Sequence, residues 1–382
     1  MTLAGLGLAL TFLGIARSAL VPEALAFATP LIALALIAAT AMPSARSLRV
    51  GASALPVVAV SFLLICSTAA RGNSVDWIKS IGIGLLWIFA FVVCANLSRR
   101  SSRTFLKMVI WFGLIQLPIM VFESLIPIAG VRNAIAATSS EGYLIRSNLI
   151  LGDWTNRAQG TLGYPIAAGN LMALCFALVL FVPRIRPTTR VVGAALFAGG
   201  VLMTGTRSGL IAIAIACVVG GWLYMRGLAR VWALVGTAIA AVAVTSFLTS
   251  ASSSGDFSFE HRFGVVQSFG ALLERPWSEV LFGSGLNSHE AAFRDGYIGA
   301  SSTWAIDNAY LTIFIASGVV ALATLIAVLA RGLLSGDQYL RPAIAVFAVF
   351  FLSYDALWWH LSAFLFWAVM GMASRADPVD RS

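Results

Sequence analysis

The chain has 382 residues, of which 59% are hydrophobic and 11% are charged, and its formal net charge is +9. Soluble domains are close to half apolar and a quarter charged, so this composition excludes an ordinary soluble enzyme, a disordered chain and a disulfide scaffold. Long apolar runs joined by short arginine-rich links predict an all-α polytopic membrane protein, because a bilayer must supply much of the solvent.

About twelve transmembrane helices are expected, since a span needs about 20 mostly apolar residues. The predicted spans are residues 2–16, 24–42, 51–69, 80–97, 105–128, 164–183, 190–204, 208–225, 231–249, 308–330, 342–354 and 357–373. The last two are divided at Ser353-Tyr354-Asp355, where a charge would otherwise lie in mid-membrane. One long tilted helix over 343–373 is the alternative. Residues 1–382 are expected to form a single bundle.

Basic residues concentrate in alternate links between the predicted spans, and positive charge marks the cytoplasmic side of a membrane protein. The links that carry them hold Arg46 and Arg49, Arg99, Arg100, Arg103 and Lys107, Arg184, Arg186 and Arg190, Arg226 and Arg230, Arg331 and Arg341, and Arg375 and Arg381. The remaining links are slightly acidic in sum. Both termini are therefore predicted to be cytoplasmic, and the positive net charge reflects membrane orientation rather than nucleic-acid binding.

Two segments on the predicted outer side are too long to be simple turns. Residues 129–163 form a first external loop, and residues 250–306 form a larger external loop between spans 9 and 10. The larger loop contains an apolar-periodic stretch, 263–273, and then a part rich in Gly and Ser. A small helical extracytoplasmic cap over the bundle is expected there.

Arginines on the predicted outer side indicate a site for an anion. Arg207 lies in a short break between two spans, beside two glycines and several hydroxyl groups that include Ser208, where the start of the next helix favours negative charge. The guanidinium is a permanently charged fork that suits phosphate oxygens. Arg157 and Arg262 face the same compartment. The alternatives are a snorkelling interfacial side chain for Arg207 and solvated loop charges for the other two arginines.

Asp307 begins the helix after the large loop, with Asn308 beside it and Tyr310 three positions later. One interpretation is a general base held near the membrane surface, where partial burial raises the pKa of a carboxyl group. The other is a simple N-cap of the helix. Further candidates for the base are Asp355, His360 and Glu123.

The sequence gives no support for a metal or a nucleotide cofactor. The segment that starts at His289-Glu290 resembles the beginning of a zinc-protease helix but has Phe293 where the second histidine is required. The three histidines show no metal-ligand spacing, and the four cysteines lie inside apolar runs. The chain also lacks a phosphate-binding loop with lysine, which excludes an ATPase of that type.

Taken in order, several short motifs over roughly residues 140–330 resemble the O-antigen polymerase and O-antigen ligase superfamily of bacterial envelope glycosyltransferases. They are 157–160 running into Gly163-Tyr164-Pro165 and Gly169-Asn170, the break around Arg207, Arg262 with an apolar helix, 281–286, and 307–311. Ligases of this superfamily typically carry His-Asn where this chain has Asp307-Asn308, which favours a polymerase. The Arg-to-Gly spacing described for some polymerases is absent, so ligation stays open.

The resemblance implies a glycan donor on a polyprenyl diphosphate, presented at the outer face of a bacterial plasma membrane. Arg207 and Arg262, helped by Arg157, would bind the diphosphate and stabilise it as the leaving group. Asp307 would take the proton from an acceptor sugar hydroxyl, in an inverting reaction without metal or cofactor. Substrate contacts are further expected at Asn308, Tyr310, Ser208, Gly283 and Gly285.

Two other classes of function remain open from the residues. A secondary transporter would show an internal repeat and broken helices with polar groups near mid-bilayer, whereas here the polar groups gather at the outer ends of spans. A flippase or an assembly partner for an envelope pathway would not require the arginines and Asp307. For a transferase, partner proteins of a polysaccharide export pathway are also conceivable.

Overall fold

The computed structural model describes residues 3–15, 23–41, 51–125, 147–148, 150–224, 267–299 and 306–375. These residues are mostly helical, as the sequence predicts. The exception to the all-α class is one small antiparallel hairpin. It pairs β1 (Ser147–Asn148) with β2 (Gly152–Asn156), so that Ser147 faces Asn156 and Asn148 faces Gly152.

The helices follow the apolar runs of the sequence closely. They are α1 (Leu3–Ile15), α2 (Glu23–Ala41), η2 (Ala52–Ala54), α3 (Leu55–Ala69), α4 (Ser74–Ala95), α5 (Arg99–Leu125), η3 (Gly160–Leu162), α7 (Pro165–Phe181), α8 (Pro187–Thr204), α9 (Arg207–Tyr224), α12 (Phe269–Leu272), α13 (Trp277–Phe282), α14 (His289–Arg294), α15 (Ala309–Ser335), α16 (Arg341–Phe350), η4 (Ala356–Trp358) and α17 (His360–Ala373). Every predicted span except 231–249 matches one of these helices, and 231–249 lies outside the described residues.

Among the described residues, four helical segments are long and apolar enough to cross a membrane, namely Ala52–Ala69, Ser74–Ala95, Arg99–Leu125 and Ala309–Leu334. Several of the remaining helices are apolar but shorter. The protein is therefore a helical chain with candidate membrane spans, and the number of twelve stays a prediction. The division near residue 354 is present, because α16 ends at Phe350 and α17 begins at His360. A single tilted helix over 343–373 is excluded.

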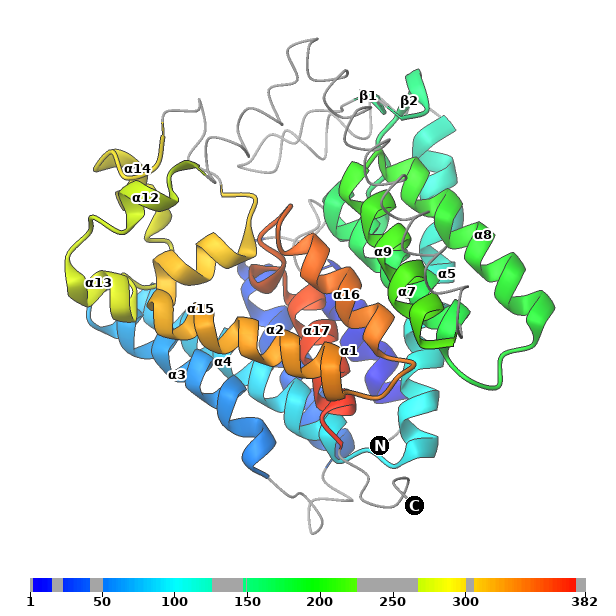
Figure 1. Cartoon of the computed structure of the whole chain (residues 1–382), viewed down its shortest axis with the longest axis horizontal. Helices are drawn as coiled ribbons and strands as arrows, with labels where there is room; N and C mark the ends of the chain where they lie inside the picture. Colours follow the sequence, from blue (N-terminus) through cyan, green and yellow to red (C-terminus); the bar gives the residue numbers. More distant parts are fainter. Residues whose placement is uncertain are drawn as a thin grey trace.

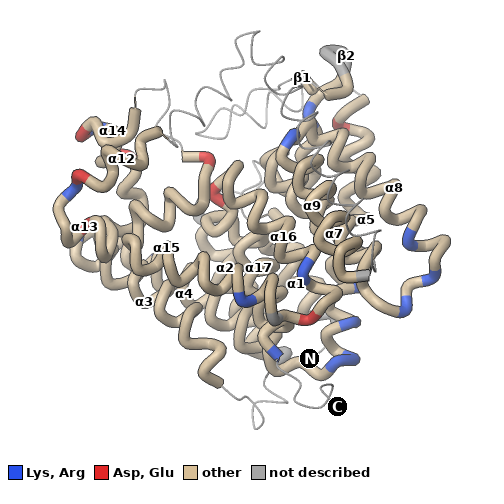
Figure 2. The backbone as a smooth tube through the Cα atoms, viewed as in Figure 1, with Lys and Arg blue, Asp and Glu red and all other residues tan. Residues whose placement is uncertain are grey.

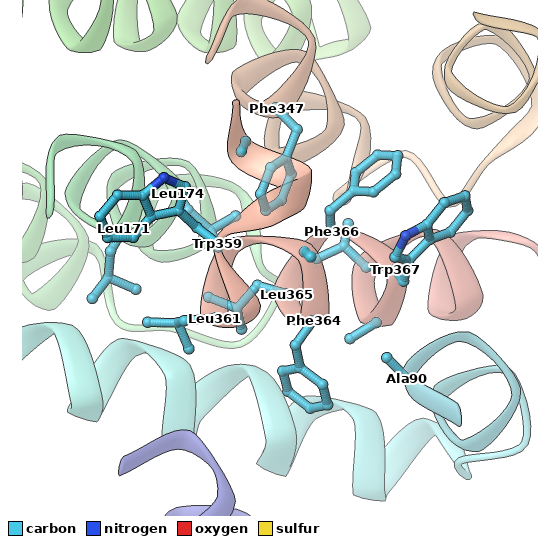
Figure 3. Close-up of a cluster of buried hydrophobic side chains, with 14 of the residues drawn as sticks. Ala90, Leu171, Leu174, Phe347, Trp359, Leu361, Phe364, Leu365, Phe366 and Trp367 are labelled. Carbon is cyan, nitrogen blue, oxygen red and sulfur yellow. The ribbon is translucent and has the colours of Figure 1, made fainter. Parts of the chain in front are cut away.

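Two helices, α7 and α17, are apolar on all sides and lie inside the bundle, as expected for such helices. Figure 3 shows side chains leaving α17 on opposite sides, with Phe364 on one side and Phe366 on the other. Phe364 lies 6.1 Å from Phe105 of α5, and Phe366 lies 5.5 Å from Phe347 of α16, measured between ring centroids. Large rings thus fill the space between α17 and its neighbours.

Charged residues gather mainly at the ends of the helices (Figure 2). At one end, Arg375 donates from Nε to the carbonyl of Ala95 over 2.9 Å and from Nη1 to Ser102 Oγ over 2.8 Å. Burial and the nearby Asp337 raise the pKa of Tyr339 to about 12. Arg375 also lies near Tyr339. The links before α5, before α16 and after α17, all predicted to be cytoplasmic, therefore meet at this end of the bundle.

The helix α15 contains a break that the sequence did not indicate. Gly318 has φ +80°, and a Cβ atom there would lie 2.1 Å from the carbonyl oxygen of Leu281. The carbonyls that the break releases have partners, because Ser284 N donates to Ile315 O over 2.8 Å and Gly285 N donates to Ala316 O over 2.9 Å. The predicted span 308–330 is therefore present as a helix long and apolar enough to cross a membrane, but it is interrupted at Gly318.

Helices α12, α13 and α14 lie at one side of the bundle, with α7, α8 and α9 at the other (Figure 1). They pack on the part of α15 before the break through a separate apolar cluster. Its buried members are Leu272, Val280, Ala292, Ile298, Ile306, Leu311, Phe314 and Ile315. We call residues 267–299 the helical cap. Its extracytoplasmic position stays a prediction.

Candidate functional site

The turn between α8 and α9 forms the first part of the candidate site. Helix α8 ends at Thr204, Gly205 adopts the left-handed conformation with φ +62°, and α9 begins at Arg207. A side chain at Gly205 would meet Asn148 Oδ1 at 2.8 Å and Arg157 Cγ at 3.1 Å. The predicted break is thus present, and its glycine is required both for the turn and for the close approach of the first loop.

Arg157 lies against this turn. Its Nε donates to the carbonyl of Thr204 over 2.9 Å, and the next backbone amide, Ala158 N, donates to Met203 O over 2.9 Å. Asn148 Nδ2 donates to the carbonyls of Leu202 and Met203. The last carbonyls of a helix have no partner within the helix and carry partial negative charge, so these donors stabilise the end of α8. They also bring Arg157 to the turn that carries Arg207.

Ser208 follows Arg207 in the first turn of α9. Its side chain is 8% exposed, and its hydroxyl has no hydrogen-bond partner among the described residues. The neighbouring Thr206 hydroxyl donates to the carbonyl of Pro165 over 3.3 Å, which connects the turn to the start of α7. A buried hydroxyl with unused capacity at a helix N-terminus, beside an arginine, is suited to an anion.

Glu123 serves the first loop as a structural acceptor. Its Oε2 accepts hydrogen bonds from Gln159 N and Gly160 N, both over 2.8 Å. About two helical turns before Glu123 on α5, Gln116 Oε1 accepts a hydrogen bond from Thr161 N over 2.9 Å. These bonds fix the loop that leads from Arg157 to α7. They account for Glu123 without a catalytic role, so we set it aside as a candidate base.

The segment Asp307–Tyr310 forms the second part of the site. Asn308 is the N-cap of α15, because its Oδ1 accepts from Leu311 N over 3.1 Å. The interpretation of Asp307 as the cap is therefore wrong. Asn308 is 5% exposed, and the Tyr310 hydroxyl donates to Ala348 O over 3.0 Å, so both side chains have structural partners, and their predicted contact with a substrate stays a prediction. Asp307 precedes the cap and is half-buried.

The start of α15 is bound to the end of α16. Ala309 N donates to Phe351 O over 2.8 Å, and Asn308 Nδ2 donates to Leu352 O over 3.4 Å. Just beyond, Asp355 Oδ1 accepts from the indole of Trp359 over 3.0 Å. The segments of two candidate bases, Asp307 and Asp355, thus lie at the same end of the bundle.

Aromatic rings connect this region to the arginine side. Tyr164, which directly precedes Pro165 and α7, stacks on Trp359 with ring centroids 5.2 Å apart and an interplanar angle of 14°. The buried ring of Tyr354 lies 6.5 Å from Tyr164. Neither Trp359 nor Asn148 was predicted as a site residue. A lone Asn in a loop gives no signal, whereas the tryptophan pair before His360 is typical of a membrane interface.

An apolar groove with a volume of about 560 Å³ begins beside Asp307. Asn308, Tyr310 and Leu352 line its polar end, and it continues along α15 to Leu333. The other lining residues are Phe269, Leu311, Leu322, Ile326, Leu329, Ala330 and Ala348. The groove is suited to a long hydrocarbon chain whose polar end lies at the start of α15.

Two further predicted site residues, Gly283 and Gly285, lie in the helical cap, where their backbone approaches neighbouring helices. A Cβ atom at Gly283 would lie 2.3 Å from the backbone of Ala316, and one at Gly285 would lie 2.7 Å from the Cα of Thr68. Close packing accounts for both glycines, and their predicted contact with a substrate stays a prediction. Arg262 lies outside the described residues. In the described part of the chain, no three His, Cys, Asp or Glu side chains are placed to hold a metal ion.

The fold and the site together define a helical protein with candidate membrane spans that carries arginines and a carboxylate at one end of its bundle. No protein-family model matches the chain, and comparison with curated proteins finds no similar sequence. The resemblance of the motifs to the O-antigen polymerase and ligase superfamily therefore stays a prediction.

Proposed function

We propose that the protein is a membrane glycosyltransferase, which moves a glycan from a polyprenyl-diphosphate donor to a sugar hydroxyl at the outer face of a bacterial plasma membrane. Its preferred reaction is the polymerisation of polysaccharide repeat units. Transfer of a finished glycan to a lipid or cell-wall acceptor, as in O-antigen ligases, is the alternative. The bundle then has twelve spans, both termini in the cytoplasm and the helical cap outside.

One observation carries this proposal: Arg157 is bonded to the turn that carries Arg207 and Ser208. Two guanidinium groups, a buried hydroxyl and the N-terminus of α9 then belong to one region. All four favour an anion with several oxygens, such as a diphosphate. Arg262, in the large external loop, would add a third guanidinium to this set.

The groove along α15 supports a lipid as the carrier of that anion. Its lining is almost wholly apolar, and its polar end lies next to Asp307. A polyprenyl chain lying in the groove keeps its hydrocarbon in contact with leucine and isoleucine side chains. The diphosphate and the first sugar then emerge at the end of the bundle where the arginines lie.

The reaction follows from these positions. The acceptor hydroxyl oxygen attacks the anomeric carbon of the donor and forms the new glycosidic bond, while its proton passes to the carboxylate of Asp307. The bond between the anomeric carbon and the diphosphate oxygen breaks, and its electron pair leaves with the lipid diphosphate. Arg207 and Ser208 stabilise that developing negative charge. Attack opposite to the leaving group inverts the anomeric configuration.

The break in α15 is the one feature that favours a transporter. Transporters bind ions and substrates with the released backbone groups of broken helices. In this chain the carbonyls of Ile315 and Ala316 accept hydrogen bonds from Ser284 N and Gly285 N instead. The break therefore serves the attachment of the helical cap, and we place transport second.

The test is an assay of the purified protein with a lipid-diphosphate-linked oligosaccharide and no added metal, read by gel and mass spectrometry. A ladder of repeat units supports the polymerase, and a single adduct on a distinct acceptor supports the ligase. Tight lipid binding without transfer from cognate substrates would contradict both and favour transport or flipping. Arg294→Ala is the matched control, because Arg294 is an exposed arginine of the helical cap far from the turn at Arg207 in sequence.

A further inference from the structure

The helical cap exposes a group of large apolar side chains on α12 and α13. Trp277 is 77% exposed, Phe282 52%, Leu273 45%, Phe269 40% and Leu281 38%. We call these five residues the anchor face. Single exposed apolar residues are ordinary, but five large ones on two short helices that follow each other in the chain favour a surface that another apolar phase covers.

The same two helices bury their other side. Leu272 is 1% exposed and Val280 is 3% exposed, and both belong to the apolar cluster on α15. The rings of Phe269 and Phe314 lie 5.4 Å apart, which ties α12 to α15. Packing on α15 therefore fixes the orientation of α12 and α13, and the exposed parts of the five side chains are the surface that this packing leaves uncovered.

Two of the charged residues near α13, Arg275 and Glu279, are hydrogen-bonded within the helical cap. Arg275 is 4% exposed and lies over the ring of Phe314, with 5.1 Å from Cζ to the ring centroid. Its Nη1 donates to Ser284 Oγ over 3.3 Å, and Ser284 Oγ donates to Glu279 Oε2. Glu274, in the turn between the two helices, is exposed and can remain among lipid headgroups. The anchor face itself carries no charge.

Hydrogen bonds to neighbouring helices indicate the depth of α13 relative to the ends of the candidate membrane spans. Ser67, at the end of the candidate span α3, donates from Oγ to Ala316 O over 2.8 Å. Leu286 N donates to Thr68 Oγ1 over 3.0 Å, and Asn287 Nδ2 donates to Asp76 Oδ1 over 2.9 Å in the first turn of α4. The segment that follows α13 therefore lies at the level where two candidate spans end.

The position of the break in α15 also indicates that α13 lies at the outer boundary of the hydrocarbon core. Residues 319–335 are about 25 Å long at 1.5 Å per residue, which is close to the ~30 Å thickness of a hydrocarbon core. The part of α15 before Gly318 and the attached α13 then lie in the interfacial layer. The part of α15 beyond the break also exposes apolar side chains, since Val320 and Ile326 are 42% and 50% exposed.

We infer that the anchor face inserts into the outer leaflet of the membrane at the boundary between headgroups and acyl chains. This inference rests on the membrane spans of the proposed function and goes beyond it, since the transfer reaction does not require it. Trp277 is the central residue, because indole rings favour the membrane interface. The cap is held at the leaflet beside the groove, where it remains close to an incoming lipid.

The experiment measures the collision of spin labels with oxygen, which concentrates in lipid, and with a water-soluble nickel complex. The protein is reconstituted in liposomes, with Cys66 and Cys217 replaced by serine because these two cysteines are exposed. Labels are placed by Trp277→Cys and Phe282→Cys on the anchor face. Ile326→Cys on α15 is the control for a lipid-facing span, and Glu290→Cys on α14 is the control for a water-exposed cap residue.

We expect the oxygen-to-nickel ratio at 277 and 282 to be several-fold higher than at 290 and close to that at 326. A ratio at 277 and 282 equal to that at 290 would overturn the anchor while leaving the spans in place. Protection from both reagents would mean that protein covers the face, and would also overturn it. Water exposure at 326 would contradict the membrane spans themselves, and the anchor with them.

Discussion

Arg157 and Thr204 are joined by a hydrogen bond of 2.9 Å from Nε to the carbonyl oxygen, across 47 positions of the chain. The bond attaches the loop before α7 to the end of α8. Because Arg207 begins the next helix only three residues later, the first loop determines where that arginine lies. The arginine side of the site is thus one unit. Glu123 stabilises it by accepting hydrogen bonds from the first loop, and Asn148 stabilises it by donating hydrogen bonds to the end of α8.

Replacing Arg157 with alanine should lower the stability of the protein. The change leaves the buried Thr204 carbonyl without its charged donor, at a cost of about 1–2 kcal/mol of unfolding free energy for a half-buried side chain. Thermal unfolding in detergent measures this loss. Arg294→Ala should unfold like the wild type, and an unchanged midpoint for Arg157→Ala would show that the bond contributes nothing.

Arg207→Ala should abolish transfer while leaving expression and thermal unfolding close to those of the wild type, because its proposed partner is the donor diphosphate. Arg207→Lys should also be poor, since a point charge does not replace a bidentate fork. Initial rates of transfer measure both effects. If Arg207→Ala transfers at the normal rate, the diphosphate lies elsewhere.

Asp307 and Asn308 should separate function from stability. Asp307→Asn keeps the shape of the side chain and removes the proposed base, so transfer should stop while unfolding is unchanged. Asn308→Ala removes the N-cap of α15 and should cost about 1 kcal/mol of stability. Near-normal turnover by Asp307→Asn would move the base to Asp355 or His360.

Glu123 should tolerate loss of its charge but not loss of its oxygen. Glu123→Gln retains an acceptor for Gln159 N and Gly160 N, so it should transfer normally. Glu123→Ala leaves two backbone amides without an acceptor and should lower stability by about 1–3 kcal/mol. Loss of transfer by Glu123→Gln at unchanged stability would return Glu123 to the candidate bases.

His289 should make the helical cap sensitive to acid. Burial lowers the pKa of His289 in the fold, and Glu290 opposes this in part. The unfolded value is about 6.5, so the unfolded chain binds more protons as the pH falls through that value, and the cap loses stability. The loss levels off below the folded pKa. Limited proteolysis of the cap between about pH 7.5 and about pH 5.5 should show it, and His289→Gln should remove the dependence.

The helices were largely predictable, because a run of about 20 apolar residues has few other uses. The prediction of 24–42 meets α2 at Glu23–Ala41, and 164–183 meets α7 at Pro165–Phe181. Helix α4 starts at Ser74 and not at 80, because its first turn is polar and is capped by Asn73, which accepts from Val75 N. A hydropathy criterion does not detect such a turn.

Contacts between distant segments were not predictable. The break at Gly318 allows the backbone carbonyl of Leu281 to pack against α15, and a single glycine in an apolar run does not predict such a contact. Gly283, predicted as a substrate contact, lies close to the backbone of Ala316 in the same region, and the sequence did not indicate this packing. By contrast, the turn between α8 and α9 before Arg207 was predictable, since Gly205 ends one apolar run and Ser208 begins the next.

The most direct test of the central claim is a count of lipid diphosphate released for each glycosidic bond formed by the purified protein. Lipid is separated and quantified by mass spectrometry, and the glycan product is measured in the same reaction. The account predicts one lipid diphosphate released per bond, with no release by Arg207→Ala. Intact donor that is bound or moved across the membrane without release would contradict a transferase.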